Sequence, residues 1–506
     1  MSALARAAAP RPPSAPPLRE LALAAGQAAE YRAAEAYNAS DYDEAIVHFL
    51  EARRLGRSHG MLHSGLGTCY LFTGREVEAI AEYRQAIRLG HREPKLIGNL
   101  IFLLDHRPET TLETALEARK AWWRNFGAPL RPTWRAHPND PDPERPLRIG
   151  YVSGDFRRHS AAIAFAPVVL RHSPGYQAVC YSNHPDADNV TENFAEASEF
   201  HEIAGLDDPA LAAKIRADRI DILVDLSGFS ARNRLEVFCR RPAPVQATGW
   251  GYATGTGLPV MDGFFADEFV VPKAWAARGY VEPLLYLPCL VPFAPMAYSD
   301  PVGPLPALTS EVFTFGSFNR WAKVTPLVLA TWAEVLARTP ASRLLLKERA
   351  FERPEIRAQV LAAMSARGVD PLRVVFRGFT DHIQHLASYH EVDLALDPFP
   401  HSGGITALEG LWAGVPPITL LGERVPERLS ASICSVLSLK AFITETRAEY
   451  IEAAVLLATK FRPQLAQIRS TLQHRMAASP LCSGYAQAVE THYRELWRAW
   501  CRRQAA

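Results

Sequence analysis

The stretch 392–417, V-D-L-A-L-D-P-F-P-H-S-G-G-I-T-A-L-E-G-L-W-A-G-V-P-P, decides the fold of this chain. Residues 392–396 form an apolar run that is typical of a buried parallel strand. A polar turn with two glycines, residues 401–404, comes next, and residues 405–412 have the spacing of a helix. A glycine and a proline stand just beyond Trp412, where helices usually end. We therefore predict a strand, a glycine turn and a helix, which together form one unit of a parallel α/β domain.

A glycine turn between such a strand and a helix favours the binding of an anion. Glycines let the backbone approach a ligand closely, and the first N–H groups of the helix attract negative charge. In α/β folds this crevice lies at the carboxyl ends of the strands. Thr406 falls in the first helical turn, within reach of a phosphate, and Glu409 follows one turn later, where it can pair with the hydroxyls of a ribose. The stretch thus indicates a loop for the diphosphate of a nucleotide-sugar, and an ordinary α/β connection without a ligand is the alternative.

The composition excludes several other classes of protein. With 506 residues the chain is too long for one hydrophobic core, so two or three domains are expected. A net charge of +1 and scattered Lys and Arg give no reason to expect nucleic acid or an anionic membrane surface as a partner. No run approaches the roughly 20 apolar residues that a membrane span needs.

The cysteines and the N-terminal segment predict a cytoplasmic location. Seven widely spaced cysteines without a C-x-x-C pair argue against a zinc site and against a disulfide framework. The first twenty residues are rich in Ala, Pro and Arg and lack an apolar core. We expect them to form a disordered tail and not a secretory signal.

A repeat of 34 residues marks the region 21–126. The matching pairs are Ala45-Ile46 with Ala79-Ile80, Phe49 with Tyr83, Ala52 with Ala86, and Leu55-Gly56 with Leu89-Gly90. Small residues let two helices pack closely while the aromatic side chain fills the gap, and this spacing is the tetratricopeptide signature. A third, degenerate unit is expected over residues 96–126. We interpret the repeats as a docking surface for a protein client, and a helical cap without a binding role is the alternative.

Two α/β lobes are predicted after a proline-rich linker at residues 127–146. Apolar strands are expected at residues 147–152, 178–181, 220–226, 245–248 and near 264–271, and then at 312–318, 344–346, 374–376, 392–396 and 418–421. Helical patterns alternate with them, as in parallel, doubly wound sheets. The first lobe is expected over residues 147–300 and the second over 308–480, followed by a C-terminal helix within 481–506.

Two histidines are candidates for the sugar or the reaction centre. His159 lies in the polar loop S-G-D-F-R-R-H-S that follows the first strand of the first lobe, at a carboxyl edge where ligand contacts gather. His201 lies near a strand start in E-F-H-E-I. A lone histidine is more often structural or merely exposed, so each assignment needs support from elsewhere.

Several motifs, in order, resemble those of a known family. They are the tetratricopeptide repeats, L-R-I-G-Y-V-S-G-D-F at residues 147–156, R-P-A-P-V-Q at 241–246, G-S-F-N at 316–319 with Lys323, the stretch 392–417, and S-P-L at 479–481. Together they resemble the O-linked N-acetylglucosamine transferase family, which includes SPINDLY-like transferases, in its shorter bacterial form. The similarity extends over roughly residues 21–500.

The resemblance implies a two-lobed GT-B glycosyltransferase preceded by an all-α tetratricopeptide domain. It implies a transferase that uses a UDP-sugar, most commonly UDP-GlcNAc, as donor substrate, without a metal or other cofactor. The acceptors are Ser or Thr hydroxyls of a protein client, and the transfer inverts the configuration at the anomeric carbon.

The resemblance also assigns roles to individual residues. Lys323, in F-N-x-x-x-K, matches the lysine that neutralises the diphosphate, and His159 and His201 match two histidines that face the sugar and the acceptor. His385 matches a histidine that stacks on the base. The remaining residues assigned to the nucleotide-sugar are Asn319, Arg320, Gly403, Gly404, Ile405, Thr406 and Glu409.

The chain departs from the family pattern at three places. Residues 247–257 read A-T-G-W-G-Y-A-T-G-T-G, where relatives usually have W-L-G-Y-P-G-T-x-G, and Ala253 replaces the proline. Ile405 replaces a common threonine, and His401 stands where bacterial relatives often have an aromatic residue. Because the loop 247–257 is expected to shape the floor of the sugar pocket, another donor, such as a CMP-linked acidic sugar in a flagellin-type transferase, is a second hypothesis. A non-catalytic scaffold is a third.

Overall fold

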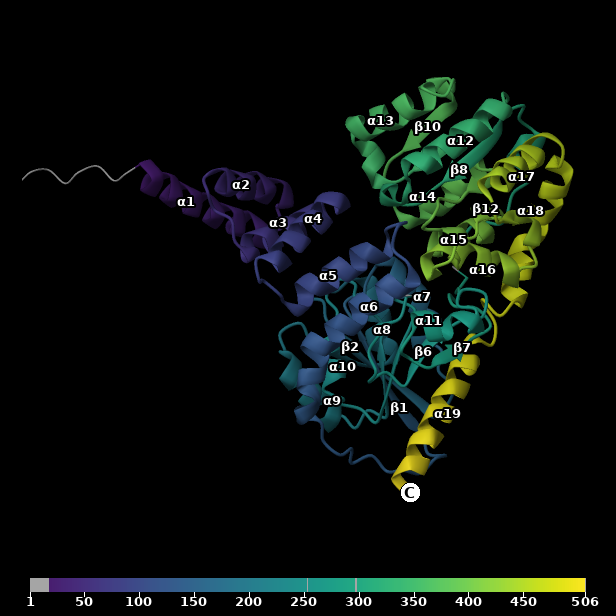
Figure 1. Cartoon of the computed structure of the whole chain (residues 1–506). Helices are drawn as coiled ribbons and strands as arrows, with labels where there is room; N and C mark the ends of the chain where they lie inside the picture. Colours follow the sequence, from purple (N-terminus) through teal and green to yellow (C-terminus); the bar gives the residue numbers. More distant parts are fainter. Residues whose placement is uncertain (1–17, 253, 296–297, 506) are drawn as a thin grey trace, which may run out of the picture. The chain divides into compact units, whose positions relative to one another are not determined.

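The computed structural model of the chain describes residues 18–252, 254–295 and 298–505 (Figure 1). Most of the predicted tail and Ala253 of the unusual loop lie outside the described residues. The chain divides into two compact units, with the boundary between Leu103 and Leu104.

The first unit consists of antiparallel helical pairs. Its helices are α1 (Leu18–Asn38), α2 (Tyr42–Arg54), α3 (Gly60–Phe72), α4 (Glu76–Arg88) and most of α5 (Pro94–Asp105). The aromatic repeat positions Phe49 and Tyr83 are buried, and a Cβ added to Gly65 would lie 2.7 Å from the ring of Phe49. The helices therefore approach as closely as the small repeat residues allow. The predicted helical repeats are confirmed.

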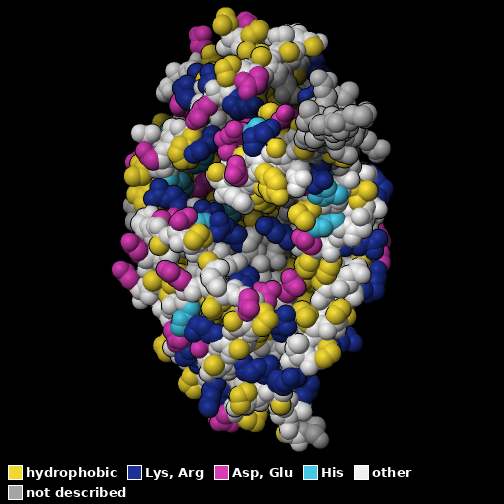
Figure 2. Space-filling view, turned by 90° about the vertical axis from the view of Figure 1, so that its left-hand side faces the viewer, with side chains coloured by type: hydrophobic (Ala, Val, Ile, Leu, Met, Phe, Trp, Pro, Cys, Tyr) yellow, Lys and Arg dark blue, Asp and Glu magenta, His cyan; other side chains and the backbone are white. Residues whose placement is uncertain are grey.

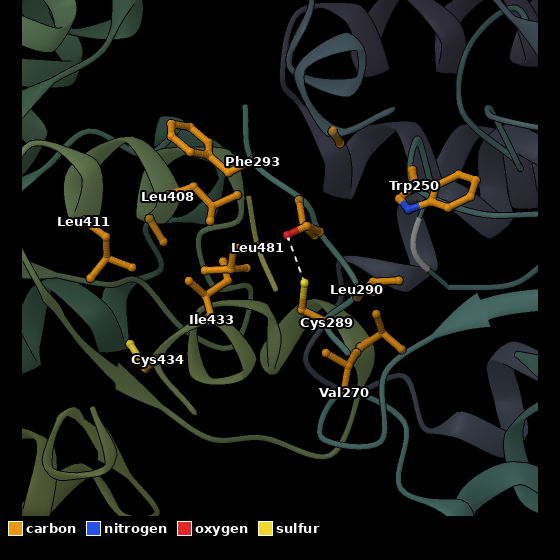
Figure 3. Close-up of a cluster of buried hydrophobic side chains, with 14 of the residues drawn as sticks. Trp250, Val270, Cys289, Leu290, Phe293, Leu408, Leu411, Ile433, Cys434 and Leu481 are labelled. Atoms are coloured by element: carbon orange, nitrogen blue, oxygen red, sulfur yellow. Dashed lines mark hydrogen bonds between the residues drawn. The ribbon is translucent and has the colours of Figure 1, made fainter. Parts of the chain in front are cut away.

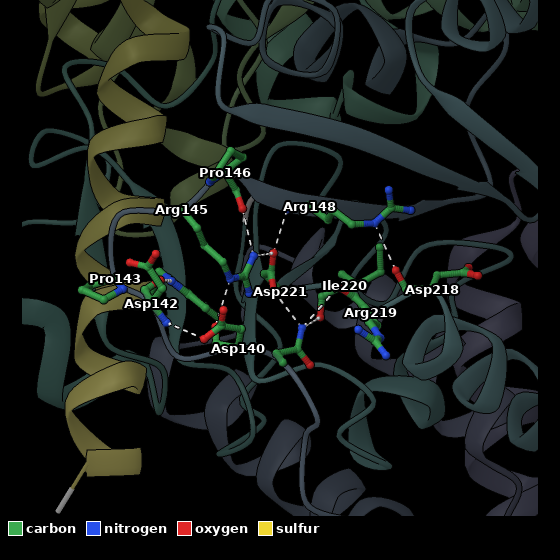
Figure 4. A network of polar contacts seen from close by, with 12 residues as sticks. Asp140, Asp142, Pro143, Arg145, Pro146, Arg148, Asp218, Arg219, Ile220 and Asp221 are labelled. Atoms are coloured by element: carbon green, nitrogen blue, oxygen red, sulfur yellow. Dashed lines mark hydrogen bonds and ion pairs between the residues drawn. The ribbon is translucent and has the colours of Figure 1, made fainter.

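The second unit begins with α6 (Leu112–Trp122) and an extended crossing that leads to the first sheet. Figure 4 shows how the crossing is fixed at Asp221, which stands just before strand β4 (Ile222–Asp225). The carboxylate of Asp221 accepts hydrogen bonds from Arg145 Nη1 at 2.9 Å and from Asn139 Nδ2 at 2.7 Å. The proline-rich linker is therefore an ordered crossing and not a free spacer.

The first lobe is a parallel sheet of seven strands in the order β3-β2-β1-β4-β5-β6-β7. Its other strands are β1 (Leu147–Ser153), β2 (Tyr176–Ser182), β3 (Glu199–Glu202), β5 (Val245–Thr248), β6 (Gly263–Ala266) and β7 (Leu284–Tyr286). The helices are α7 (Ser160–Val169), α8 (Asn189–Ala197), α9 (Asp208–Ala217), α10 (Leu235–Cys239) and α11 (Ala276–Gly279). The central strands are buried on both faces, as expected of a doubly wound sheet.

The structure corrects the strand predictions of this lobe in two ways. The strand expected near residues 264–271 ends at Ala266, because the carboxylate of Asp267 accepts hydrogen bonds from the backbone N–H of Val270 at 2.6 Å and of Leu290 at 2.7 Å and closes a turn. Strand β7 was not predicted, and β3 was expected only as a strand start near His201. Both lie at the edges of the sheet, are only partly buried and are too short to give a clear strand pattern.

The second lobe is a six-stranded parallel sheet in the order β10-β9-β8-β11-β12-β13. Its strands are β8 (Phe313–Ser317), β9 (Ser342–Lys347), β10 (Val374–Arg377), β11 (Leu394–Leu396), β12 (Pro417–Leu420) and β13 (Ile443–Thr444). Its helices are α12 (Pro326–Arg338), α13 (Pro354–Ser365), α14 (His382–Ala387), α15 (Ile405–Trp412), α16 (Leu429–Val436), α17 (Arg447–Thr459) and α18 (Arg462–Ala478). The fold class predicted from the sequence, helical repeats followed by two Rossmann-like lobes, is confirmed.

Two segments of the chain connect the lobes, and they run next to each other. The backbone N–H of Phe293 donates a 2.7 Å hydrogen bond to the carbonyl of Leu481, which pairs the outgoing crossing with the returning one. Figure 3 shows apolar side chains from both lobes meeting there, including Leu408 of α15. After the return, α19 (Tyr485–Ala505) packs on the first lobe, where Tyr485 accepts a hydrogen bond of 2.8 Å from Trp250 Nε1. The hydrophobic core is continuous through both lobes.

The surface carries no extended field of one sign on the face that Figure 2 shows, where Lys and Arg side chains are intermingled with Asp and Glu. This agrees with the net charge of +1.

Candidate active site

The turn between β11 and α15 has the shape of an anion-binding loop. The backbone N–H of Gly403 donates a 2.8 Å hydrogen bond to Asp397 Oδ1, at the end of the strand. A Cβ on Gly403 would stand 2.9 Å from Thr406 Oγ1 and 3.0 Å from Asp397 Oδ1, so a larger residue does not fit there. Gly404 occupies the N-cap of α15 and provides no side-chain cap for the first N–H groups of the helix, which start at Ile405. These donors and the helix dipole favour a negatively charged ligand.

Lys323 reaches the same turn from the neighbouring strand. It lies in the 3₁₀ turn Trp321–Lys323 after β8, and its Nζ donates a hydrogen bond of 2.8 Å to the carbonyl oxygen of Ser402. Burial, together with the charge of Arg320, lowers the pKa of Lys323 to about 7, although Asp397 acts in the opposite direction. A partly buried ammonium group with few opposite charges near it is stabilised by the binding of an anion.

Asn319 and Thr406 connect this lysine segment to the helix. Thr406 Oγ1 donates a hydrogen bond of 3.0 Å to Asn319 Oδ1, and the carbonyl of Thr406 accepts one of 3.0 Å from the hydroxyl of Tyr389. A small cavity of about 20 Å³ lies beneath, lined in part by Asn319, Thr406 and Asp397. Arg320 is exposed beside it.

Glu409 is buried between two histidines of α14. Its Oε1 lies 2.8 Å from His382 Nε2, and its Oε2 lies 3.5 Å from His385 Nε2. Burial alone would raise the pKa of Glu409, but the two histidines outweigh it and lower the pKa. His382 Nδ1 lies 2.8 Å from the hydroxyl of Tyr298, so a neutral His382 with its proton on Nε2 satisfies both partners.

His385 has the surroundings expected of a base-stacking residue. Its ring lies 5.6 Å, between ring centroids, from both Phe318 and Tyr389, edge to face in each case. The side chain stays partly exposed. An imidazole held on edge by two aromatic rings presents an open face to a planar ligand.

His159 approaches from the first lobe. It caps the N-terminus of α7, where Nδ1 accepts a hydrogen bond of 3.2 Å from the backbone N–H of Ala161. Helix α7 contacts α15, and the charge of Arg320 from the second lobe acts on His159, so His159 lies in the same region as the lysine segment. Burial lowers the pKa of His159, as do Arg157 and Arg320, against the opposite effect of Asp155. A neutral His159 therefore carries its proton on Nε2.

His201 is not brought to this group. It lies in the edge strand β3, where its Nε2 is 3.0 Å from Glu199 Oε1 and 3.8 Å from Asp218 Oδ2. The register pairs His201 with Tyr181 of β2, which pairs in turn with Val152 of β1, so its backbone lies towards the carboxyl ends of the strands. Asp218, which the ring approaches, is the C-cap of α9. The ring stacks on Tyr181 with centroids 5.4 Å apart.

Asp397 is a functional candidate that sequence reasoning missed. It is buried and holds Gly403 with one oxygen while the other accepts a hydrogen bond of 2.8 Å from Thr419 Oγ1. Burial raises the pKa of Asp397 to about 6. The hydrogen bond from Gly403 to Asp397 fixes the conformation of the glycine turn.

The same arrangement of a buried aspartate beneath a glycine turn occurs in the first lobe, where two aspartates have the spacing D-x-x-x-D. Asp225, four residues after Asp221, accepts hydrogen bonds from Gly228 N–H at 2.9 Å and Thr248 Oγ1 at 2.8 Å, and burial raises its pKa to about 6 as well. In the second lobe Asp393 precedes Asp397 by the same interval. The first acid of each pair accepts from a neighbouring strand, and the second accepts from the following glycine turn. This repeated spacing is the signal that could have identified Asp397.

The residues described on either side of Ala253 in the unusual loop 247–257 make close contacts with their neighbours. Trp250 adopts a left-handed backbone conformation (φ 59°), and its ring stacks on Phe265 with centroids 4.6 Å apart. A Cβ on Gly251 would stand 1.6 Å from the carbonyl oxygen of Leu226, so only glycine fits. Tyr252 donates a hydrogen bond to the buried carboxylate of Asp105.

Comparisons with known proteins agree with this geometry. The model of the family described as glycosyl transferase family 41 matches residues 131–292 and 305–489, well over half of the chain. The chain is 35% identical to the probable UDP-N-acetylglucosamine–peptide N-acetylglucosaminyltransferase SPINDLY of Solanum lycopersicum over 414 residues, which cover 80% of the chain and 44% of that protein. It is 31% identical over 375 residues to the Arabidopsis thaliana protein of the same description called SEC, covering 70% of the chain and 37% of that protein.

A solved structure resembles the whole chain. The O-GlcNAc transferase of Thermobaculum terrenum, solved as a lysine-to-methionine mutant, superposes with a TM-score of 0.85 at 31% identity, and the match covers 96% of this chain and 93% of that one. The chain spans about half the length of the curated relatives it matches. In the part of the chain that the structure describes, no helix has both the length and the apolar content to cross a bilayer. The resemblance noted in the sequence is confirmed, and the chain belongs to glycosyltransferase family 41.

Proposed function

We propose that the protein transfers N-acetylglucosamine from UDP-GlcNAc to Ser or Thr hydroxyls of a protein, with inversion and without a metal. The observation that carries this proposal is the convergence of Lys323 and the uncapped N-terminus of α15 on one glycine turn. A cation and a row of N–H groups suit a diphosphate leaving group, whose charge grows as the glycosidic bond breaks. The names of the relatives, which are UDP-GlcNAc–peptide transferases, support the choice of donor and acceptor.

The donor would lie along the second lobe. The diphosphate is proposed to bind at Gly403, Gly404 and Lys323, with the Thr406 hydroxyl beside it. The base would stack on His385, and the ribose would lie near Glu409. Because His382 and His385 already contact both oxygens of Glu409, we propose that the ribose hydroxyls bind to this histidine–carboxylate group as a whole.

The acceptor would enter from the first lobe beside His159. A neutral His159 whose Nδ1 accepts from Ala161 has its proton on Nε2, so it donates a hydrogen bond to a sugar or acceptor oxygen and does not act as the base. The proton of the attacking hydroxyl would then pass to a donor phosphate oxygen or to water. The attack occurs on the face opposite the diphosphate, in one displacement. The catalytic role of His201, whose Nε2 contacts Glu199, stays a prediction.

The helical repeats are proposed to dock the protein client. Several of their apolar side chains are exposed, among them Tyr31 and Met61, with about two thirds of their surface accessible. Exposed apolar side chains on a repeat array are suited to protein contacts. The cytoplasmic location stays a prediction.

Mass spectrometry of a defined reaction tests the proposal. The purified full chain is incubated with UDP-GlcNAc and a tryptic peptide library, and peptides that gain one N-acetylhexosamine on Ser or Thr are sought. We expect modified peptides with the wild type and with Lys440→Ala, which removes an exposed lysine of the same lobe, but not with Lys323→Ala. The same modification by Lys323→Ala would contradict the assignment of the diphosphate site.

A different donor is a second candidate, and the unusual loop around Trp250 motivates it. Its sequence differs from the family pattern, and Trp250 is held by the ring of Phe265 and the hydroxyl of Tyr485. Thermal shift against UDP-, GDP- and CMP-sugars separates the two candidates. A response to UDP-sugars alone removes the second one, and a response to CMP-sugars alone removes the first.

A further inference from the structure

Three turns at the carboxyl edge of the first lobe carry positive charge. Strands β2, β1 and β4 are neighbours in the parallel sheet, so the turns that follow them lie at the same edge. The turn after β1 contains Arg157 and His159, the turn after β2 contains His184, and the turn after β4 leads to Arg232. His159, at this edge, is the residue proposed above to face the acceptor.

Direct contacts hold the three turns together. A Cβ on Gly154 would stand 2.8 Å from the Cβ of Arg232, so the turn after β1 lies against Arg232. Asn183 Nδ2 donates a hydrogen bond of 2.8 Å to the carbonyl of Arg232, which joins the turn after β2. The backbone N–H of Arg158 donates one of 2.7 Å to Asp188 Oδ2. The three turns that carry the charged side chains therefore form one continuous surface.

The guanidinium groups of this surface are poorly compensated within the chain. The side chain of Arg232 makes no hydrogen bond or ion pair with any residue that the structure describes, and the same holds for Arg320, which approaches from the second lobe. Arg157 Nε is buried without a hydrogen-bond partner, and the nearest carboxylate oxygen, from Asp155, lies 3.7 Å from Nη2. Arg232 also has a left-handed backbone (φ 61°), which is unfavourable for a residue with a side chain and often marks a functional position.

The acids on the same turns do not neutralise these groups fully. Asp155 lies 3.7 Å from Arg157 and 3.6 Å from His159. Asp188 accepts hydrogen bonds from backbone N–H groups at the start of α8, and Asp186 is largely exposed to solvent. Burial lowers the pKa of His184, and the charges of Arg232 and Arg157 lower it further. The arginines therefore dominate the local potential.

We infer that Arg157 and Arg232 bind acidic side chains that flank the acceptor hydroxyl, so that the protein prefers Ser or Thr in an acidic segment. This inference rests on the proposed function, in which the second lobe holds the diphosphate and the first lobe meets the acceptor. A donor neutralised by Lys323 and α15 leaves the arginines of the first lobe for the acceptor. Guanidinium groups pair with carboxylates through two parallel hydrogen bonds, which suits Asp and Glu side chains.

Direct binding tests the inference without requiring turnover. Three fluorescent peptides share one central Ser and carry Asp and Glu, Gln, or Lys at the flanking positions, and their binding to the full chain in the presence of UDP is followed by anisotropy. We expect the acidic peptide to bind roughly tenfold more tightly than the Gln peptide and the Lys peptide to bind more weakly still. Arg232→Glu removes most of this preference or reverses it.

Arg219→Glu is the matched control. Arg219 is also exposed and also has a left-handed backbone (φ 51°), but it lies before β4, at the opposite edge of the same sheet. It should bind the three peptides as the wild type does. Equal binding of the three peptides by the wild type, or the same change in both variants, overturns the inference. A change in UDP affinity of Arg232→Glu, with peptide binding unaltered, assigns the arginine to the donor and also overturns it.

The outcome is separable from the proposed function. If the chain neither binds UDP nor hydrolyses UDP-GlcNAc, the proposed function fails, whatever the peptides do. If it binds UDP and hydrolyses the donor but shows no preference for acidic flanks, only the present inference fails.

Discussion

The ammonium group of Lys323 donates a hydrogen bond of 2.8 Å to the carbonyl oxygen of Ser402, and this contact ties the turn after β8 to the glycine turn after β11. The lysine thus binds the peptide next to Gly403, which Asp397 holds from the other side. The glycine turn therefore has a hydrogen bond to a lysine on one side and to a carboxylate on the other, independently of any ligand. Such preorganisation is what a site for a charged leaving group requires.

Removing Lys323 should reduce transfer without unfolding the protein. Because a single group that stabilises developing charge is commonly worth a factor of about 100 to 1,000 in turnover, we expect kcat of Lys323→Met to fall by roughly that amount. Circular dichroism and thermal unfolding should stay close to the wild type. A kcat within threefold of the wild type would contradict the assigned role.

Donor affinity should depend on pH through Lys323. Burial lowers its pKa to about 7, so the lysine loses its charge as the pH rises through 7, while a bound diphosphate favours the charged form. The Kd of UDP-GlcNAc should therefore increase by roughly tenfold between pH 6.5 and 8.5. Lys323→Arg is the control, since a guanidinium stays charged over this range and its binding should be nearly independent of pH.

Asp397 and Asp225 should differ in function while they agree in stability. Each is a buried acceptor of a glycine N–H and a threonine hydroxyl, so replacement by Ala leaves buried donors without partners at a cost of roughly 2–4 kcal/mol. Both variants should unfold at a lower temperature than the wild type. Only Asp397→Ala should also weaken UDP binding, and a similar loss in Asp225→Ala would show that the effect is merely one of stability.

The two histidines predicted from the sequence should behave differently. His159→Ala removes the hydrogen-bond donor that is proposed to face the acceptor and should lower kcat/KM by roughly 10 to 100-fold. His201→Ala removes a partly exposed contact with Glu199 and should change kcat/KM less than threefold. A larger loss in His201→Ala than in His159→Ala would reverse the two assignments.

Sequence reasoning succeeded where the signal is local. The apolar strand, the two glycines and the helix of residues 392–417 define their structure without distant partners, and the observed α15 (Ile405–Trp412) agrees with the predicted helix. The 34-residue spacing likewise identified the helical repeats, because each repeat packs mainly on its neighbours.

The rest depends on contacts between segments far apart in the chain. A single histidine in an edge strand gives no indication of what its side chain contacts. The contacts of His201 with Glu199 and Asp218 illustrate this. His382 was missed because only the packing of α14 on α15 brings it to Glu409, although its i, i+3 spacing from His385 was visible. The surroundings of Trp250 depend on Tyr485, more than 200 residues later in the chain, and no local pattern could have indicated that hydrogen bond.

Calorimetric titration of UDP tests the central claim, a diphosphate site formed by Lys323 and the turn before α15, most directly. We predict that UDP binds to the wild type and to Lys440→Ala with the same Kd, and at least tenfold more weakly to Lys323→Ala. Equal affinity of all three proteins for UDP, or no binding to the wild type at millimolar concentrations, would contradict it.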